Sequence, residues 1–350
     1  MPRPISIGLN AAIIAIRDLS PVILEVRLPG MAQQRASQPS PTSPYAADAD
    51  LAALPFGPFE PRRHRTLEMG LRSWVKQLTG LRLGYVEQLY TFGDRGRRLE
   101  SDESEPHEVS IGYLALTQLR EHADGGAEAQ LSELGWGWRS WYSHFPWEDW
   151  RADRPALLDE QIIPALEQWA RDAPDDGNKP LSPKQRLRLS FGIDGPVWDE
   201  ERVLERYELL YEAGLVTEHY KDRGLAPDPA KPLFGQPMQM DHRRILATAI
   251  SRLRSKLKYR PVVFELLPQS FTLTQLQETV EAISGQHLHK QNFRRLVEQG
   301  QLVEPTGASS TSTGGRPAKL YRFRRSVQVE RPAPGLRFGS VGPVGKETSQ

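Results

Sequence analysis

Hydrophobic residues in the first 120 positions follow a pattern that predicts a sheet with one helix. Two apolar, β-branched runs, residues 5–16 and 22–28, are separated by Asp-Leu-Ser-Pro and predict a hairpin. Apolar positions three and four residues apart then predict an amphipathic helix over residues 65–78, which Thr79-Gly80 ends. Runs at 85–92 and 109–119 predict two more strands. The order strand, strand, helix, strand, strand indicates a mixed domain.

The pattern beyond residue 120 predicts helices with polar breaks between them. Helical periodicity covers residues 157–170 and 199–213, and a polar loop or linker separates them at 174–186. The proline-rich stretch 226–240 predicts an interdomain linker. Residues 31–50, rich in Ala, Ser, Pro and Gln without periodicity, predict a disordered insertion, and residues 326–350 a disordered tail.

Residues 241–325 show the order helix, helix, turn, helix and hairpin. An apolar stripe on residues 245–257 predicts a helix that joins the two domains. Thr272 and Gln275 form a capping box that opens a helix over 273–283, and a Ser-Gly turn ends it. A second helix covers 290–299, and a hairpin with a Gly-Gly-Arg-Pro tip follows. The pattern predicts a winged helix-turn-helix domain and an α+β fold overall.

The net charge of +1 hides two segments of opposite sign. Residues 1–240 hold 27 Lys and Arg against 36 Asp and Glu, a balance of 27 − 36 = −9. Residues 241–325 hold 15 against 6, a balance of 15 − 6 = +9. Basic density confined to one compact segment is typical of a protein that binds a polyanion, because phosphate contacts release condensed counterions.

The second helix of this segment has the side chains that read a DNA groove. Its inward positions are apolar, so its amide and guanidinium groups lie on the outer arc, where they match adenine and guanine edges. Arg316 stands between a glycine and a proline in the tip of the hairpin, or wing. It is slim enough there to lie along a phosphate strand or to enter a narrow minor groove. The predicted partner is a double-stranded DNA operator, with a winged helix that binds protein as the alternative. The DNA-binding candidates are Thr274, Gln275, Lys290, Gln291, Asn292, Arg294, Arg295, Arg316 and Lys319.

Composition narrows the class of protein further. The chain has no cysteine, which excludes disulfides and thiolate zinc sites and favours a cytoplasmic location. No run of 18 apolar residues occurs, so no membrane span is predicted. The histidines lack metal-ligand spacing, and we expect no metal site.

Three segments together resemble the Nudix-related transcriptional regulators of NAD metabolism. They are EQLYTFGDRGR at residues 87–97, the helix that ends in TGL at 79–81, and FTLTQLQE…NFRR…GRPAKLYRF near the C-terminus. The resemblance implies a Nudix-like α/β/α sandwich over residues 1–225 that senses an NAD-related nucleotide, followed by a winged helix that represses genes of NAD synthesis or salvage. The implied effector is ADP-ribose, NAD or a related adenine nucleotide, with no cofactor.

The Nudix-like helix lacks the carboxylates that hydrolysis needs. A catalytic Nudix box holds Mg²⁺ on glutamates along one helix face. If Arg72 takes the motif arginine, Ser73, Lys76 and Gln77 replace the three glutamates, and no other register restores them. The sequence therefore predicts a sensor without catalytic residues. The alternative is an active Nudix pyrophosphohydrolase of ADP-ribose or NADH with an accessory nucleic-acid-binding domain. Its carboxylates would have to come from an unusual site built from Glu87, Glu100 or the acidic loop 102–108.

Binding a nucleotide without metal requires arginines for the phosphates and aromatic faces for the base. We expect a homodimer in which two winged helices grip a roughly palindromic operator, with the nucleotide altering the dimer geometry. The predicted nucleotide-binding residues are Arg62, Arg63, Tyr90, Phe92, Arg95, Arg97, Arg98 and Tyr113.

Overall fold

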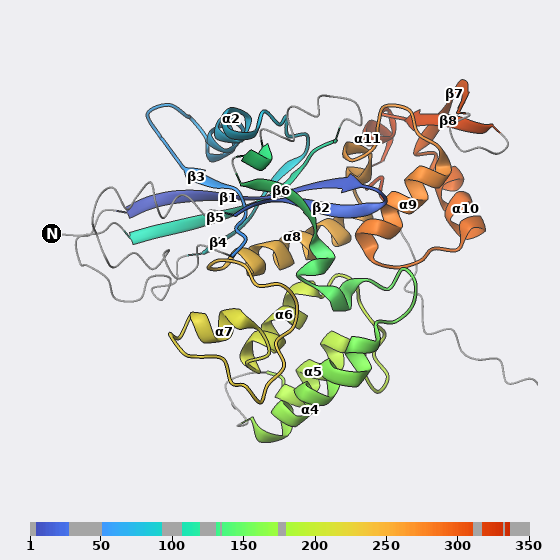
Figure 1. Cartoon of the computed structure of the whole chain (residues 1–350). Helices are drawn as coiled ribbons and strands as arrows, with labels where there is room; N and C mark the ends of the chain where they lie inside the picture. Colours follow the sequence, from blue (N-terminus) through green and yellow to red (C-terminus); the bar gives the residue numbers. More distant parts are fainter. Residues whose placement is uncertain are drawn as a thin grey trace, which may run out of the picture.

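The computed structural model has a mixed β-sheet at its centre (Figure 1). It describes residues 5–27, 51–92, 107–119, 131–133, 135–173, 180–310, 317–331 and 333–336. In this part of the chain the sheet has the strand order β4-β5-β1-β2-β6, and β3 pairs with β1. The strands are β1 (Ile5–Arg17), β2 (Ser20–Val26), β3 (Phe56–Pro58), β4 (Val86–Phe92), β5 (His107–Leu116) and β6 (Trp136–Ser140).

Strand β1 is the centre of the sheet because both of its faces are apolar. It pairs with β5 in parallel and with β2 in antiparallel register, where Ile14 lies opposite Ile23. Leu9, Ala11 and Ile13 pack into the core on one face, whereas Ala12 and Ile14 pack into the core on the other. This two-residue alternation buries the strand between two layers of side chains.

Helices cover the two faces and complete a three-layer sandwich (Figure 1). On one face, α2 (Leu67–Thr79) buries Leu71, Trp74 and Val75 against the sheet. Thr66 accepts the Met69 amide at its N-terminus, and Gly80 ends it with φ of 69°. On the other face, α8 (His242–Leu257) contacts β1, β4 and β5. The predicted α/β/α sandwich is confirmed.

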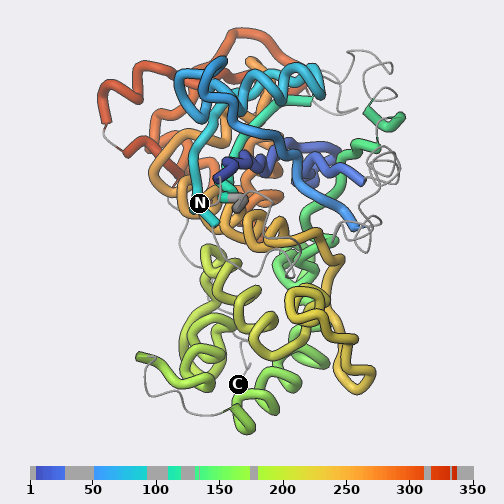
Figure 2. The backbone as a smooth tube through the Cα atoms, turned by 90° about the vertical axis from the view of Figure 1, so that its left-hand side faces the viewer, coloured from blue at the N-terminus to red at the C-terminus, as the bar shows by residue number. Residues whose placement is uncertain are grey.

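A helical region lies between the sandwich strands and α8 in the sequence, and it forms a separate lobe. Figure 2 shows it as a green and yellow lobe below the sheet. Its core includes Trp141 and Trp147, both fully buried. The elements are η2 (Trp141–Ser143), η3 (Pro146–Glu148), η4 (Leu158–Ile162), α4 (Ile163–Asp172), α5 (Pro183–Phe191), α6 (Val203–Glu212) and α7 (Thr217–Lys221).

The winged helix follows α8 and packs beside one end of the sheet (Figure 1). The capping box and the apolar periodicity had predicted α9 and α10 to within a residue at each end, and the hairpin is also present. The elements are η5 (Val262–Glu265), α9 (Leu273–Ser284), α10 (Lys290–Gly300), β7 (Val303–Ser310), β8 (Ala318–Phe323) and α11 (Val327–Glu330).

Several predicted boundaries differ from the structure. Helix α5 begins at Pro183, inside the expected polar stretch 174–186, because Ser182 and Gln185 form a capping box. The stretch 226–240 buries Phe234 and Met238, and the Gln239 amide donates to the Ala52 carbonyl. It therefore packs onto the sandwich and the helical region, which together form the body of the protein, and is not a flexible linker. Helix α8 covers the sheet and so belongs to the sandwich, although we expected the winged-helix domain to start at residue 241.

The expected disordered tail, residues 326–350, contains ordered structure at its start. Helix α11 buries Val327 completely, and Leu336 is also buried while its amide donates to the Leu257 carbonyl. A short apolar segment that docks on a surface made elsewhere in the chain has no periodicity of its own to predict it. Residues 31–50 and 337–350 lie outside the described residues.

Candidate nucleic-acid interface and effector site

The helix-turn-helix is fixed at its start by the predicted capping box. The Thr272 hydroxyl accepts the Gln275 amide at 3.1 Å, and the Gln275 side-chain oxygen accepts the Thr272 amide at 2.8 Å. These two bonds use the Gln275 backbone amide and side-chain oxygen, so the side-chain NH₂ group is not part of the capping box. Thr274 and Gln275 are both exposed in the first turn of α9, where we expected DNA-binding residues.

Glu281 organises the turn between α9 and α10. Its carboxylate accepts the Leu288 amide at 2.8 Å and the Gln277 side-chain amide at 2.9 Å. The His287 ring lies 3.2 Å from the same oxygen. The sequence had not singled out Glu281, since its partners come from a turn whose path only the fold reveals. These bonds set the angle at which α10 leaves α9.

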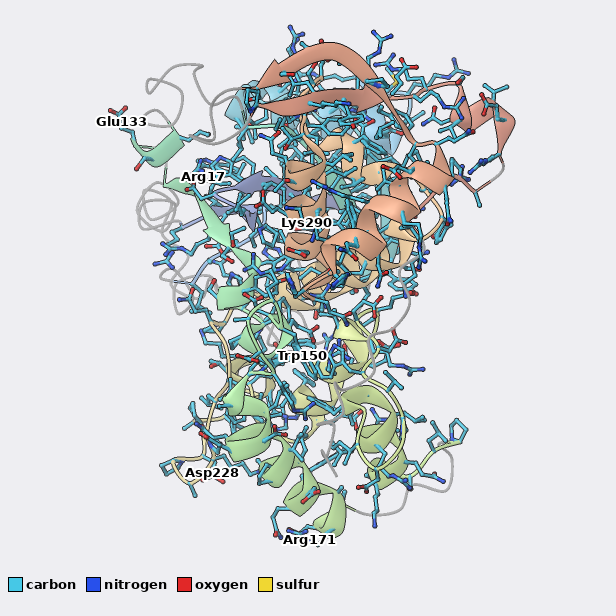
Figure 3. The ribbon with its side chains drawn as sticks, turned by 90° about the vertical axis from the view of Figure 1, so that its right-hand side faces the viewer. Arg17, Glu133, Trp150, Arg171, Asp228 and Lys290 are labelled. Atoms are coloured by element: carbon cyan, nitrogen blue, oxygen red, sulfur yellow. The ribbon has the colours of Figure 1, made fainter. Side chains whose placement is uncertain are left out.

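Helix α10 presents the whole predicted outer arc to solvent. Phe293 and Val297 are buried against the core, which orients the helix. Figure 3 shows Lys290 near the start of this helix on the outer face of the winged helix. The N-terminal end of a helix carries a partial positive charge, which suits it to approach phosphates. The exposed residues on or beside this arc are Lys290, Gln291, Asn292, Arg294, Arg295 and the acidic Glu298.

The wing, the hairpin of β7 and β8, is anchored to the start of α9. Phe271 and Tyr321 exchange two backbone hydrogen bonds, at 2.9 and 2.8 Å. Phe264 stacks on Phe323, with ring centroids 4.4 Å apart. Lys319 on β8 is exposed, whereas Arg316 lies outside the described residues. The wing base is therefore fixed relative to the start of α9.

The cations of α8 are not part of the surface that α10 and the wing expose. Arg243 and Arg254 are fully buried and pair with Glu218 and Glu148. The other pairs that join this helix and its C-cap to upstream carboxylates are Arg244–Glu208, Arg252–Glu87, Lys256–Glu87, Lys258–Glu200 and Lys258–Glu201. Much of the +9 balance of residues 241–325 is thus neutralised by carboxylates of the same chain. Exposed cations lie on α10, at Lys290, Arg294 and Arg295, and on the wing strand β8, at Lys319 and Arg322.

A second candidate site lies where α2 meets β4 and β5. Tyr113 is 2% exposed, and its hydroxyl donates to the Gln88 side-chain oxygen at 3.3 Å. Burial, with the nearby charge of Glu68, raises the pKa of Tyr113 above its usual range. Glu68 itself accepts a hydrogen bond from Arg72 at 2.8 Å. Gln88, Glu68 and Arg72 were not among the predicted nucleotide-binding residues.

Arg72 connects α2 to the loop that leads into β4. Its guanidinium donates to the Leu83 and Gly84 carbonyls at 2.6 and 2.9 Å, in addition to the bond with Glu68. This arginine takes the place of the Nudix-box arginine in one register of the sequence. In the structure it holds a loop, a role that its spacing from Glu68 alone could not indicate.

The predicted nucleotide-binding residues do not all converge. Phe92 packs with the core on the α8 face, whereas Tyr113 belongs to the core on the α2 face, so these two rings cannot line one side of a cleft. Adjacent strands place two residues on one face only in the right register, and β4 has a bulge between Gln88 and Thr91. Tyr90 is 55% exposed.

The arginines of the predicted group lie at the surface or beyond the described part. Arg62 and Arg63 are exposed in the turn before α2, and Arg63 pairs with Glu60 at 3.1 Å. Arg95, Arg97 and Arg98 lie outside the described residues. Within the described ranges no three His, Asp or Glu side chains come together as a metal site, and none of the helices there is long and apolar enough to cross a membrane.

These elements define a mixed-sheet α/β/α sandwich joined to a winged helix-turn-helix domain. Residues 263–323 match the family model described as the NrtR DNA-binding winged helix domain, which supports the sequence resemblance for this segment. The match ends at the last residue of β8.

The chain is also similar in sequence or fold to other known proteins. A segment of 86 residues is 42% identical to the ADPR responsive transcriptional repressor NtrR of Acinetobacter baylyi; it covers 25% of this chain and 34% of that protein. The chain therefore aligns with about a third of the length of this curated relative. Crystal structures of Shewanella oneidensis NrtR, with a 27mer DNA and without it, each match with a TM-score of 0.50 at 19% and 18% identity. Both alignments cover 92% of this chain and 95% of the other, and they show a shared fold.

Proposed function

We propose that this protein is a transcriptional repressor that binds a DNA operator through α10 and the wing. The observation that carries the proposal is the exposed arc of basic and amide side chains on α10, within a segment that matches a DNA-binding family. A major groove admits one helix, and such side chains pair with base edges there. The solved relative of the same fold was crystallised with DNA.

The proposed effector is ADP-ribose, bound by the Nudix-like sandwich and not hydrolysed. The relative from A. baylyi is described as ADPR responsive, and its aligned segment is 42% identical. Helix α2 has a single carboxylate, Glu68, and this is engaged by Arg72. Mg²⁺-dependent hydrolysis of a pyrophosphate needs several carboxylates on that helix, so binding without turnover fits the residues present. The proposed targets are genes of NAD synthesis or salvage.

The DNA-binding proposal is tested by a mobility shift with duplex DNA from upstream of NAD-biosynthesis genes in the source genome. Arg295→Ala should weaken specific binding by about 1 to 3 kcal/mol and relax the preference at one base pair. Arg171→Ala is the matched control, because Arg171 is an exposed arginine on α4, at the opposite end of the molecule (Figure 3). Equal affinity and equal sequence preference for the two variants would refute the assignment of α10 to the groove.

The effector proposal is tested by calorimetry with ADP-ribose, NAD and ATP added separately. We expect ADP-ribose to bind in a single class of sites, to change the mobility shift, and to be recovered intact after incubation with Mg²⁺. Release of AMP and ribose phosphate at a rate proportional to protein would show an enzyme instead. Binding of NAD or ATP alone would reassign the effector.

We propose that the protein acts as a homodimer, because two recognition helices are needed to read a palindromic operator, with half-sites spaced by about one helical turn of 34 to 36 Å. Light scattering on the full chain should give twice the monomer mass of 39.6 kDa, and the shifted complex should contain two chains per duplex. A monomer in both measurements would contradict this part of the proposal.

A further inference from the structure

The C-terminus of α9 ends inside the protein, on groups that belong to the body. The last carbonyls of a helix have no partners within the helix and must be satisfied from outside. The Tyr142 hydroxyl donates to the Ala282 carbonyl at 2.8 Å, and the Arg254 guanidinium donates to the Ile283 carbonyl at 2.9 Å. The Trp150 amide donates to the Gly285 carbonyl at 2.7 Å. None of these three donors comes from the winged helix.

Glu148 fixes one of these donors in place. Its carboxylate is 1% exposed and accepts hydrogen bonds from Arg206 on α6, at 2.6 and 2.8 Å, and from Arg254 on α8, at 2.6 Å. Arg254 also donates to the Glu200 carbonyl at 3.0 Å. These bonds hold the Arg254 guanidinium against the C-terminus of α9. Its positive charge favours this contact, because the C-terminus of a helix carries a partial negative charge.

Gly285 allows the close approach between α9 and the body. It has φ of 73°, and a Cβ placed there would lie 2.3 Å from the Glu148 carbonyl oxygen and 2.9 Å from an Arg254 nitrogen. The Arg254 guanidinium is held by the Glu148 carboxylate and by the Ile283 and Glu200 carbonyls, and it also donates to the Glu148 carbonyl, so an added Cβ would disturb a bonded cluster. In Figure 3, Trp150 lies between the helical region and the winged helix.

We infer that Tyr142, Glu148, Trp150 and Arg254 form a rigid joint that fixes the orientation of the helix-turn-helix on the body. Because α9 and α10 are tied together through Glu281, fixing the end of α9 also fixes the direction of α10. The two parts then move as one unit. The consequence for DNA binding rests on the proposed function. In a dimer, the joint sets the spacing of the two recognition helices, so an effector changes that spacing by moving one whole chain relative to the other.

The joint can be tested without DNA or effector, by measuring a distance across it. The chain has no cysteine, so Glu167→Cys on α4 and Gln299→Cys on α10, both exposed positions, accept one spin label each. When the doubly labelled chain is diluted with an excess of unlabelled chain, so that a dimer rarely holds two labelled chains, it should give one narrow distance distribution. Gly285→Ala should shift or broaden it, because the added Cβ meets backbone that is held in place.

Gly80→Ala is the matched control for this substitution. Gly80 caps α2 as Gly285 caps α9, with φ of 69° against 73°, but nothing lies within 4 Å of a Cβ added there. The two variants carry the same backbone cost, and only one disturbs the joint. We expect the Gly80→Ala distribution to equal that of the parent. An unchanged distribution in Gly285→Ala would overturn the inference.

A second pair keeps the test valid if Gly285→Ala does not fold. Tyr142→Phe removes the hydroxyl that bonds Ala282, and Tyr220→Phe removes an equally buried hydroxyl that bonds the Gly214 carbonyl at 3.0 Å. Tyr142→Phe should broaden the distribution and weaken operator binding about two- to tenfold, whereas Tyr220→Phe should do neither. A narrow distribution in Tyr142→Phe contradicts the joint, whereas absence of any DNA shift in the parent chain contradicts only the proposed function.

Discussion

Buried charges at single positions govern how the parts of this protein hold together. Burial would raise the pKa of the Glu148 carboxyl, but the charges of Arg206 and Arg254 outweigh it and keep that pKa below its usual range. A carboxyl whose pKa is lower in the folded state stabilises the fold at neutral pH. That contribution is lost as the pH falls below about 4 toward the lowered folded-state pKa.

Glu148→Gln should therefore cost about 3 to 5 kcal/mol of unfolding free energy at pH 7, because it leaves two buried guanidinium groups without a counter-charge. Urea unfolding at pH 7 and at acidic pH measures both the loss and its pH dependence, which should be shallower in the variant. Glu304→Gln is the control, since its pair with Arg322 on the wing is exposed and worth at most about 1 kcal/mol. Equal losses in the two variants would contradict a structural role for the Glu148 cluster.

At this scale the sequence predicted the exposed residues better than the buried polar ones. The outer arc of α10 follows from its apolar positions Phe293 and Val297, because helix geometry then fixes which side chains face out. The partners of Glu148 and Glu281 come from segments far apart in the chain, and no spacing rule connects them. The separation of Tyr113 from Phe92 likewise depends on strand register and a bulge.

Among the elements, α10 depends on the segment that follows the wing. Arg324 donates to the Gln301 carbonyl at 2.8 Å, and Arg331 donates to the Gly300 carbonyl at 3.0 Å, so two cations cap the C-terminus of this helix. Arg324 also pairs with Glu330 on α11. Helix α11 in turn buries Val327 completely. This short helix therefore helps to hold the recognition helix.

A chain that ends at Arg325 should lose protection of α10 amides from hydrogen exchange. It lacks the Arg331 cap and the buried Val327 side chain, whose transfer from water contributes about 1.5 to 3 kcal/mol. Hydrogen exchange followed by mass spectrometry of α10 peptides measures the effect, and a chain that ends at Leu336 is the control. Equal α10 protection in the two truncated chains would show that α11 has no part in holding α10.

Elements with their own start and stop signals were predictable, and those that depend on neighbours were not. Helices α2 and α9 have a capping residue, an apolar stripe and a terminal glycine, and the structure confirms both. The pattern does not predict strand β6, a five-residue edge strand with the sequence Trp-Gly-Trp-Arg-Ser that pairs with β2. Helices α7 and α11 have five and four residues, too short for a periodic signal.

Across the whole molecule, the opposite charges of the two segments have two different uses. Part of the positive charge, on α8, neutralises carboxylates of the sandwich and the helical region and so stabilises the body. On α10 and the wing strand β8, by contrast, Lys290, Arg294, Arg295 and Lys319 are exposed. A charge count over sequence segments cannot separate these uses, because it does not record which side chains meet. The packing of α8 against the sheet determines which of the cations pair with carboxylates.

The salt dependence of DNA binding should distinguish the two sets of charges. Each phosphate contact contributes about 0.9 to the slope of log affinity against log salt concentration, so Lys319→Ala on the exposed wing strand should reduce that slope by about 1. Arg252→Ala removes a cation of α8 that lies 3.9 Å from Glu87, and it should leave the slope unchanged. Mobility shifts over a range of salt concentrations, with one duplex for the parent and both variants, provide the comparison. If Arg252→Ala lowered the slope as much as Lys319→Ala, the polyanion surface would extend onto α8, and the division of charge argued from the ion pairs would be wrong.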